Sequence, residues 1–240
     1  MVKPNQHRGV IVPMATPFTS NGSLDEPAVE RLVAHLAGND MAVFVLAPPG
    51  EPASIPAPAR ARLVEIAVKN AAGRVPVYAG LSDNCFLGSS EAARTWLRLG
   101  VDAVVAPLPS YYLLTPAEMQ AWYERLAHEI NGPLVLYNIP QTTRMSVPLE
   151  VVERLSQHPL VVGFKDSENA PARLEKAAAL FARRADFSIF MGASVLSAEA
   201  LRHGFDETVM DAVGHDQPRR GGAALPGREE CAVDGAIHRC

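Results

Sequence analysis

The sequence contains few cysteines and few lysines, and both scarcities narrow its interpretation. The three cysteines, Cys85, Cys231 and Cys240, are an odd number and include no CxxC pair. A disulfide framework and a zinc knuckle are therefore disfavoured, and a reducing compartment such as the cytoplasm is expected. All but four of the basic residues are arginines, so each lysine is informative; the lysines are Lys3, Lys69, Lys165 and Lys176.

Other absences exclude whole classes of function. No apolar run reaches the roughly 18 residues that a membrane span needs, and the start MVKPNQHRGV has no apolar signal region, so neither a membrane partner nor secretion is expected. The net charge of -4 gives no sign of nucleic-acid binding. The seven histidines form no HxH or HxxxH pair, so no metal site is expected; they are His7, His35, His128, His158, His203, His215 and His238.

What the sequence does contain is typical of a soluble globular protein. Hydrophobic residues make up 48% of the chain and charged residues 20%, which argues against disorder, collagen and coiled coil. A length of 240 residues suits either two small domains or one large barrel, whose typical length is about 250 residues.

Short apolar runs alternate with longer amphipathic segments along most of the chain. The runs are nearly continuously apolar, as strands buried on both faces are; they are Val10–Ala15, Ala42–Ala47, Val75–Gly80, Ala103–Pro107, Leu134–Asn138, Val161–Lys165 and Phe187–Met191. The segments between them have helical periodicity and are expected at Pro27–Ala37, Ala59–Ala72, Glu91–Leu99, Pro116–Ile130, Pro148–Gln157, Ala172–Arg184 and Val195–His203. Thr115 and Glu118 form a capping box before one of these helices, and Gly73 and Gly100 follow two others as C-caps.

Seven strand–helix units in succession predict a parallel sheet with helices outside it. A doubly wound open sheet is one solution, but no GxGxxG follows the first strand, so the dinucleotide-binding version lacks its phosphate loop. The regular spacing and the lack of a second domain favour a (β/α)8 TIM barrel, whose catalytic groups lie at the carboxyl ends of the strands.

Lys165 is the strongest candidate for catalysis. It ends a buried strand, where a charge is costly, and a desolvated lysine amine becomes neutral more easily and attacks carbonyls to form Schiff bases. The alternative is a strand-end lysine that extends to solvent or pairs with Asp166. Tyr137 ends the preceding strand, and its hydroxyl would face the same cavity and move protons. The alternative for Tyr137 is a core aromatic residue bonded to the backbone.

Three further residues have weaker claims to the site. Tyr111 and Tyr112 lie in a loop before a capped helix, as a substrate lid, a subunit contact or ordinary surface residues would. Gly192 follows the seventh strand, where a ligand approaches the backbone or the chain simply turns. A (β/α)8 enzyme for a phosphate-bearing substrate would have a glycine-rich loop there, and Gly192-Ala193-Ser194 is a poor version of one.

These residues together resemble a known family. The segments VPMATPFTSNGSLD, PGE, VPVYAG, LVLYNIP and VVGFKDS are similar to the dihydrodipicolinate synthase / N-acetylneuraminate lyase family of Schiff-base aldolases on a (β/α)8 barrel. The resemblance extends from about Gly9 to about Asp206. It implies that Lys165, in the K-D-S motif, forms the Schiff base with pyruvate or another 2-oxo acid, and that Tyr137, in the Y-N-x-P motif, transfers protons. It implies no metal and no organic cofactor.

The chain departs from the family at its substrate loops. The G-T-T-G-E loop of the family, which binds the substrate carboxylate and relays protons, here reads Ala47-Pro48-Pro49-Gly50-Glu51. Proline offers neither a hydroxyl nor a backbone N–H, so the carboxylate contact and the relay are both in question. The second tyrosine of the family, which crosses a dimer interface, falls at Tyr111 or Tyr112. Thr142 stands where true dihydrodipicolinate synthases have an arginine, and Arg144 lies two residues further on.

The second departure is at the end of the chain. After Asp206 the family continues into an eighth strand, a closing helix and a helical extension, whereas here the hydrophobic periodicity stops. We therefore expect a catalytic domain at residues 1–206, with strands one to seven, and an aberrant tail at 207–240. The barrel would be incomplete at its eighth unit and would lack the extension, although Glu207–Val213 offers a poor strand. Translation in a shifted reading frame would produce such a tail, and an open barrel would expose the edges of its first and seventh strands.

The sequence as a whole thus predicts a Schiff-base lyase or aldolase for pyruvate or a related 2-oxo acid, and the resemblance implies a homo-oligomer, either a dimer or a tetramer. The missing arginine at Thr142 argues against a strict dihydrodipicolinate synthase, because the guanidinium fork suits a carboxylate. The alternative is a non-catalytic or truncated remnant of the family that binds a small 2-oxo acid or nothing, which Pro48, Pro49 and the tail favour.

Overall fold

The computed structural model describes residues 9–209 of the chain. Within this range the parallel strands form one closed barrel, in which each strand pairs with the next in sequence and the last pairs with the first. The strands are β1 (Gly9–Pro13), β2 (Ala42–Val45), β3 (Val77–Gly80), β4 (Ala103–Pro107), β5 (Leu134–Asn138), β6 (Val161–Asp166), β7 (Ser188–Met191) and β8 (Glu207–Val209). The predicted (β/α)8 fold is therefore confirmed.

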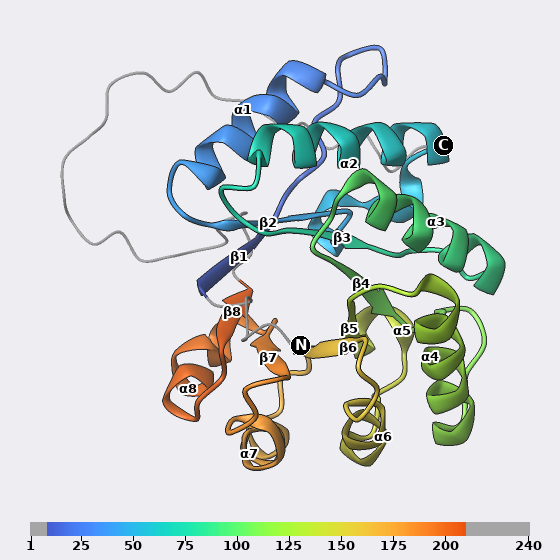
Figure 1. The fold of residues 1–240 in the computed structure, drawn as a ribbon, viewed down its shortest axis with the longest axis vertical. Helices are drawn as coiled ribbons and strands as arrows, with labels where there is room; N and C mark the ends of the chain where they lie inside the picture. The colour runs from blue at the N-terminus through green and yellow to red at the C-terminus, as the bar shows by residue number, and fades with distance from the viewer. Residues whose placement is uncertain (1–8, 210–240) are drawn as a thin grey trace.

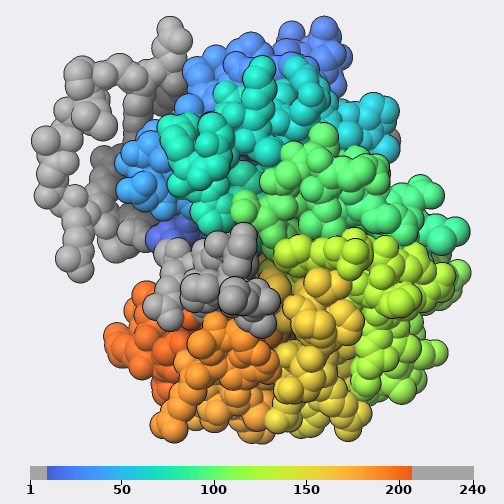
Figure 2. All heavy atoms as spheres, in the orientation of Figure 1, coloured from blue at the N-terminus to red at the C-terminus, as the bar shows by residue number. Residues whose placement is uncertain are grey.

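Helices lie around the outside of the strands (Figure 1). The α-helices are α1 (Glu26–Ala37), α2 (Ala57–Ala71), α3 (Phe86–Leu99), α4 (Pro116–Ile130), α5 (Pro140–Thr143), α6 (Leu149–Leu155), α7 (Pro171–Phe181) and α8 (Ser197–Arg202), with 3-10 turns η1 (Pro48–Gly50), η2 (Pro52–Ser54) and η3 (Ser194–Leu196). The space-filling view shows the units following one another around the molecule in chain order, from blue to orange (Figure 2).

Each of the seven apolar runs overlaps a strand, as predicted, although β1 begins one residue before its run and β6 ends one residue after its run. The runs Ala103–Pro107 and Leu134–Asn138 coincide with β4 and β5 from end to end. The signal is strong because the strands are covered on both faces, so that nearly every residue along them is buried.

The expectation that the first and seventh strands have exposed edges is wrong, because both strands pair with β8. In β8, Glu207, Thr208 and Val209 pair with residues of β1, and Glu207 and Thr208 also pair with β7. Three residues in extended conformation are enough to satisfy the backbone groups on both neighbouring edges, whatever the side-chain pattern. The tail predicted from residue 207 thus begins with a barrel strand. The predicted loss of the closing helix and of the extension, together with the reading-frame hypothesis, concerns residues 210–240, outside the described range.

Two layers of buried side chains hold the barrel together. One layer lies between strands and helices and includes Val43, Leu63 and Leu126. The other fills the barrel interior and consists of alternate strand residues, among them Ile11, Phe44, Tyr78, Val105, Val135, Tyr137 and Phe190. Because alternate residues of a strand face opposite sides, each strand contributes to both layers. The interior layer forms the floor on which the site is built.

The helix ends largely follow the predicted signals. The capping box is present: the Thr115 hydroxyl accepts a hydrogen bond from the Glu118 N–H, and the Glu118 carboxylate accepts one from the Thr115 N–H. Gly100 ends α3 with a φ of 99°. However, α3 begins at Phe86 rather than Glu91, because Ser89 and Ser90 are buried and their hydroxyls bond to backbone carbonyls, which apolar periodicity does not reveal. No helix in the described range is long and apolar enough to cross a membrane.

Candidate active site

Lys165 and Tyr137 lie side by side in the barrel interior, at the carboxyl ends of β6 and β5. The two residues are paired in the sheet register. The Lys165 side chain is buried, and its Nζ lies 3.7 Å from the centre of the Tyr137 ring and 5.5 Å from that of Phe44. This contact holds the end of a long flexible side chain against an aromatic ring face. We call the carboxyl ends of β5 and β6, residues 137–138 and 165–167, the lysine rim.

The amine of Lys165 borders a small apolar cavity of about 10 Å³. The other residues around it are aliphatic or aromatic: Ile11, Phe44, Tyr78, Val105, Val135 and Phe190. Gly163 makes this packing feasible, because a β-carbon there would lie 2.8 Å from the Phe190 ring. Lys165 as a whole is 5% exposed. The alternative in which its side chain extends to solvent is therefore wrong.

Ser167 connects the lysine and the tyrosine. Its Oγ lies 3.5 Å from Nζ of Lys165 and 3.3 Å from the Tyr137 hydroxyl. Gly192 holds it there: a β-carbon at position 192 would lie 2.0 Å from the Ser167 Oγ, and the Gly192 N–H donates to the Asp166 carbonyl at 2.7 Å. Gly192 therefore acts on the site through Ser167. Ser167 was missed as a site residue, although the K-D-S motif contains it.

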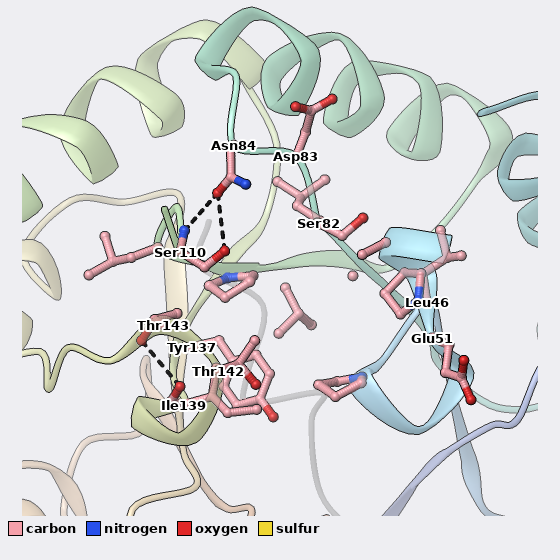
Figure 3. A pocket seen from close by; sticks show the side chains of 18 of the residues that line it. Leu46, Glu51, Ser82, Asp83, Asn84, Ser110, Tyr137, Ile139, Thr142 and Thr143 are labelled. Carbon is pink, nitrogen blue, oxygen red and sulfur yellow. Dashed lines mark hydrogen bonds between the residues drawn. The ribbon is translucent and has the colours of Figure 1, made fainter. Parts of the chain in front are cut away.

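A larger cavity of about 300 Å³ opens beside the lysine rim. Phe44 and Val105 border both cavities, whereas Lys165 borders the small cavity and is not among the lining residues of the large one. Figure 3 shows Tyr137, Ile139 and Thr142 on one side of it and Leu46 and Glu51 on the other. Its polar side chains are mostly small; they include Ser54, Ser82, Asp83, Asn84, Ser110, Thr142 and Thr143. A volume of this size accommodates a small organic molecule.

The predicted substrate residues divide into two groups. Pro48, Glu51, Tyr137 and Thr142 line the large cavity. Pro49, Gly50, Tyr111, Tyr112 and Gly192 are not among its lining residues. The sequence placed all of them near strand ends correctly, but it did not reveal which side chains reach the cavity.

Pro48–Ser54, which we call the proline rim, forms two consecutive 3-10 turns at the opposite side of the cavity. Gly50 is packed tightly, because a β-carbon there would lie 2.8 Å from the Met14 carbonyl oxygen, and its own carbonyl accepts a hydrogen bond from Thr16 at 2.8 Å. Glu51 is exposed and has a φ of 50°. Gly50 thus has a structural role in the loop, whereas Pro48 and Glu51 face the cavity.

Tyr111 and Tyr112 lie at an exposed tip. They are 76% and 75% exposed, their ring centres are 4.9 Å apart at 79°, and the next residue, Leu113, is 72% exposed. This arrangement suits a subunit contact better than a lid, because neither ring borders the cavity. Arg144 is also exposed and is absent from the cavity lining, so the structure does not bring it to the place of the missing arginine.

The comparisons with known proteins agree with this geometry. The model of the dihydrodipicolinate synthetase family matches residues 6–216. The chain belongs to this family. The match extends past Asp206, where the resemblance read from the sequence ended, and it includes all three residues of β8.

The family relatives are named consistently. The chain is 34% identical over 161 residues to a 4-hydroxy-tetrahydrodipicolinate synthase of Exiguobacterium sibiricum, covering 67% of this chain and 55% of the relative. It is 32% identical over 199 residues to the enzyme of that name from Stenotrophomonas maltophilia, covering 82% and 66%. The chain thus spans between about half and two thirds of the length of these curated relatives. Their names do not confirm the expectation that this chain is something other than a strict synthase, which stays a prediction.

Solved structures of the family share the fold. A dihydrodipicolinate synthase from Bacillus anthracis superposes with a TM-score of 0.81 at 26% identity, covering 85% of this chain and 70% of that chain. A sialic acid aldolase from Ruminococcus gnavus, a catalytic lysine mutant, superposes with a TM-score of 0.80 at 23% identity, covering 87% and 68%. Both structures thus share the (β/α)8 fold of this chain.

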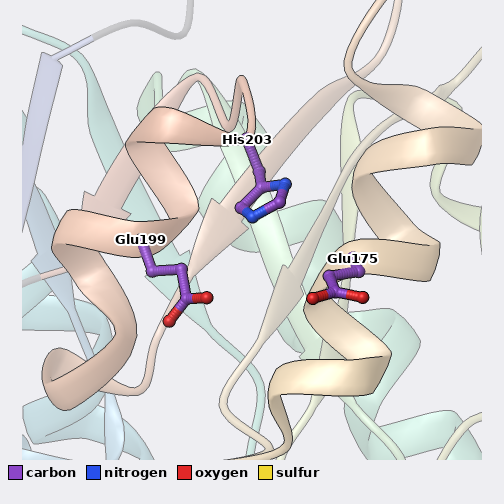
Figure 4. Close-up of side chains that lie close together, drawn as sticks. All are labelled: Glu175, Glu199 and His203. Carbon is purple, nitrogen blue, oxygen red and sulfur yellow. The ribbon is translucent and has the colours of Figure 1, made fainter.

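A separate group of side chains lies on the outer surface of the barrel. Glu175 of α7, Glu199 of α8 and His203 approach one another, with ligand-type atoms within 4.8 Å (Figure 4). The sequence has no histidine pair that would indicate this group, because its members are one histidine and two glutamates, and Glu175 lies far along the chain from the other two. Glu175 and His203 are exposed and Glu199 is half-buried. None of the three residues lines either cavity.

Proposed function

We propose that this chain is a Schiff-base lyase or aldolase that condenses Lys165 with pyruvate or a related 2-oxo acid and makes or breaks the adjacent carbon–carbon bond. The observation that supports this most is the burial of one amine against the Tyr137 and Phe44 rings, because these two residues also line a cavity that suits a small substrate. An apolar environment disfavours the ammonium form, which favours the nucleophilic amine.

The proposed reaction begins at the C2 carbonyl of the 2-oxo acid. The Lys165 nitrogen attacks C2, its two protons pass to the carbonyl oxygen, and the oxygen leaves as water, which produces a neutral imine. The Tyr137–Ser167 pair then donates a proton to the imine nitrogen and later takes one back from C3. Loss of a proton from C3 gives an enamine, because the imine accepts the electron pair. The enamine carbon then attacks an aldehyde, or the reverse sequence releases one, and hydrolysis frees the amine.

Tyr137 and Ser167 are in position to move the protons in this sequence. Ser167 Oγ lies within hydrogen-bonding distance of both the Tyr137 hydroxyl and Nζ of Lys165, at 3.3 Å and 3.5 Å. A proton can therefore pass from the nitrogen region to the tyrosine without bulk water. No residue of this pathway needs a metal or an organic cofactor.

The carboxylate of the substrate needs hydrogen-bond donors, and the proline rim offers few. Neither Pro48 nor Pro49 has a backbone N–H or a hydroxyl. The lining residues Ser82, Ser110 and Thr142 carry hydroxyls, and we propose that these take over part of the recognition. Because Thr142 replaces a guanidinium fork with one hydroxyl, we propose a partner other than the aspartate semialdehyde of a strict dihydrodipicolinate synthase.

We propose further that the protein acts as a homo-oligomer, because the exposed tip of Tyr111, Tyr112 and Leu113 is the kind of apolar surface that subunit contacts cover. The scarcity of cysteine supports a reducing compartment such as the cytoplasm.

The experiment that tests the function is reductive trapping. The full chain is incubated with pyruvate and borohydride, and intact-mass and peptide spectra are recorded. We expect one reduced pyruvate adduct, located on Lys165. A folded protein with no adduct for pyruvate or any member of a 2-oxo acid panel would refute the proposal.

The alternative function is that of a remnant that binds a small 2-oxo acid without turnover, and the two prolines favour it. Pro48→Thr together with Pro49→Thr restores the hydroxyls and the N–H groups. If the lost donors are what limits the chain, trapping of the double variant should require about tenfold less pyruvate than that of the wild type. An unchanged dependence on pyruvate would show that the prolines do not limit binding.

A further inference from the structure

Four polar side chains behind the lysine rim form one hydrogen-bonded group, which we call the Asp166 cluster: Asn138, Asp166, Glu168 and Arg173. Arg173 Nε of α7 lies 2.6 Å from Asp166 Oδ2 and 3.4 Å from Glu168 Oε2. Asn138 Nδ2 donates to Asp166 Oδ1 at 2.8 Å and to Glu168 Oε2 at 3.0 Å. Each of the four side chains thus contacts two others of the group. Through these contacts the group joins β5, β6 and α7.

The Asp166 cluster also fixes the chain that follows β5. The Asn138 carbonyl-type Oδ1 accepts a hydrogen bond from the Val147 N–H at 2.9 Å, and Arg173 Nη2 donates to the Val147 carbonyl at 2.7 Å. The Ser146 hydroxyl donates to Glu168 at 2.6 Å. The segment held in this way carries Thr142, which lines the large cavity.

The position of the cluster relates it directly to the amine. In the sheet register Tyr137 pairs with Lys165, and the next residues, Asn138 and Asp166, pair with each other. Because successive strand residues face opposite sides, one pair faces the barrel interior and the other faces the helices. The contacts with α7 therefore hold the outer pair, Asn138 and Asp166. Each of these residues is joined by one peptide bond to Tyr137 or Lys165, so the inner pair is held as well.

Arg173 carries the only guanidinium of the cluster, opposite two carboxylates. Its side chain is 14% exposed and that of Asp166 is 4% exposed. A buried carboxylate that loses its counter-charge is strongly disfavoured, so removal of the guanidinium would leave Asp166 and Glu168 to repel each other and to draw in water. The strand ends would then move, and with them the Lys165 side chain.

We propose that Arg173 is a positioning residue, which holds the ends of β5 and β6 through the Asp166 cluster so that Nζ of Lys165 stays over the Tyr137 ring; its effect on the reaction rests on the proposed function. Arg173 lies outside both cavity linings, so it acts through Asp166 and Asn138 and does not itself touch the substrate.

The matched control is Arg184, the residue that performs a similar structural task just beyond the other end of α7. It pairs with Asp186 at 2.6 Å and donates to the Ser156 hydroxyl and carbonyl at 2.6 and 2.9 Å, with a side chain that is 24% exposed. Arg173→Met and Arg184→Met each remove one guanidinium, the first near the beginning of α7 and the second just after its end. Arg173→Lys keeps the charge but not the fork and serves if Arg173→Met does not fold.

The first readout does not depend on activity. The chain has four lysines, so a carbon–proton NMR spectrum with labelled lysine shows four sets of side-chain signals, and Lys165→Met identifies one of them. Protons beside a nitrogen 3.7 Å from the centre of the Tyr137 ring are shifted upfield by the ring current. We expect Arg173→Met to lose this upfield shift, Arg173→Lys to recover part of it, and Arg184→Met to retain it.

The second readout is the rate of borohydride trapping with pyruvate. We expect Arg173→Met to lower the rate at saturating pyruvate about 100-fold, because a displacement of about 1 Å has that cost, while the half-saturating concentration changes less. Arg184→Met should lower the melting temperature but keep the wild-type rate. If Arg173→Met, or Arg173→Lys in its place, keeps both the upfield shift and the rate, the positioning role is refuted. If the wild type forms no adduct, the proposed function fails, and the NMR comparison still decides the positioning role.

Discussion

The two sides of the cavity are built in different ways. The lysine rim is held by side chains that bond to side chains: Asp166 contacts Asn138 and Arg173, and Ser167 contacts Lys165 and Tyr137. The proline rim is held by backbone bonds within its own turns, such as the Glu51 N–H to the Pro48 carbonyl at 3.0 Å and the Ser54 N–H to the Glu51 carbonyl at 3.0 Å.

This difference indicates a division of tasks between the two rims. A network of buried polar groups keeps atoms in one arrangement, as chemistry at a fixed nitrogen requires. A short turn stabilised by backbone bonds keeps its shape through changes of side chain, so residues such as Pro48 can vary with the substrate. We therefore expect substitutions in the lysine rim to change rates and substitutions in the proline rim to change the preferred substrate.

The largest effect is expected at the amine. Lys165→Met keeps most of the buried volume but removes the nucleophile, so trapping with pyruvate should fall below detection. Lys176→Met changes an exposed lysine of α7 and should leave the adduct unchanged. Mass spectrometry after borohydride treatment measures both. An adduct on another lysine of the Lys165→Met variant would contradict the assignment of the nucleophile.

The next effect concerns the proton carrier. Tyr137→Phe removes one hydroxyl from the lysine rim, and the rate of trapping should fall by about 100- to 10,000-fold while the fold persists. Tyr123→Phe is the matched control, because its buried hydroxyl donates to the Ala106 carbonyl at 3.0 Å and also bonds to the Tyr137 backbone, so this variant changes the same strand end and leaves the Tyr137 phenol in place. This control should lose about 1 kcal/mol of stability in urea unfolding and keep the wild-type rate. Equal rates for the two variants would rule out the role of Tyr137.

A pair of glycine substitutions compares the two rims directly. Gly192→Ala drives a β-carbon into Ser167 and should slow trapping about tenfold, because the bridging hydroxyl must move. Gly50→Ala meets the Met14 carbonyl and should instead cost about 1–3 kcal/mol of unfolding free energy and raise the pyruvate concentration needed. Stopped-flow trapping and urea unfolding separate the effects. If both variants changed only stability, the division of tasks would be wrong.

The smallest effect is a change in the stability of the fold at acid pH, caused by Glu168 of the Asp166 cluster. Burial acts to raise the pKa of Glu168, but hydrogen bonds from Ser146 and Asn138 and the charge of Arg173 outweigh it, so the pKa is lowered from its ordinary value of 4.5. A lowered carboxyl pKa stabilises the folded state above the unfolded-state pKa, and this stabilisation is lost as the pH falls through the lowered value.

Glu168→Gln should therefore reduce the loss of unfolding free energy between neutral pH and about pH 3, as measured by urea unfolding at several pH values. The wild type should show a steeper decrease over the acid end of this range. Parallel curves for the two proteins would mean that the ionised Glu168 carboxylate adds no stability to the lysine rim.

The sequence predicted the architecture well because each strand and helix of the barrel has a clear local hydrophobic pattern. Strands covered on both faces must be apolar along their length, and the amphipathic segments between them must have helical periodicity. The same pattern places Lys165 and Tyr137 at neighbouring strand ends, since parallel strands end at the same side of the barrel. It also marks Ser167, although the motif alone did not show that its hydroxyl joins the lysine to the tyrosine.

Other features of the structure have no local pattern in the sequence that would predict them. β8 closes the barrel with three residues whose backbone matters more than their side chains, so periodicity could not reveal it. Arg173 lies seven residues after Asp166, on a helix, and nothing in that spacing distinguishes it from an exposed arginine. Gly192 resembled a ligand contact and is instead the space that Ser167 occupies.

By itself, the sequence determined the order of strands and helices and placed Lys165 and Tyr137 at neighbouring strand ends on one side of the barrel. These follow from period and residue type, which act over a few neighbouring positions. Only the tertiary structure decided that the barrel closes, that the amine is packed against two aromatic rings, and that Asp166 and Arg173 stand behind it. Each of these depends on atoms far apart in the chain, whose contacts are set by how the strands curl into a barrel and not by any local pattern.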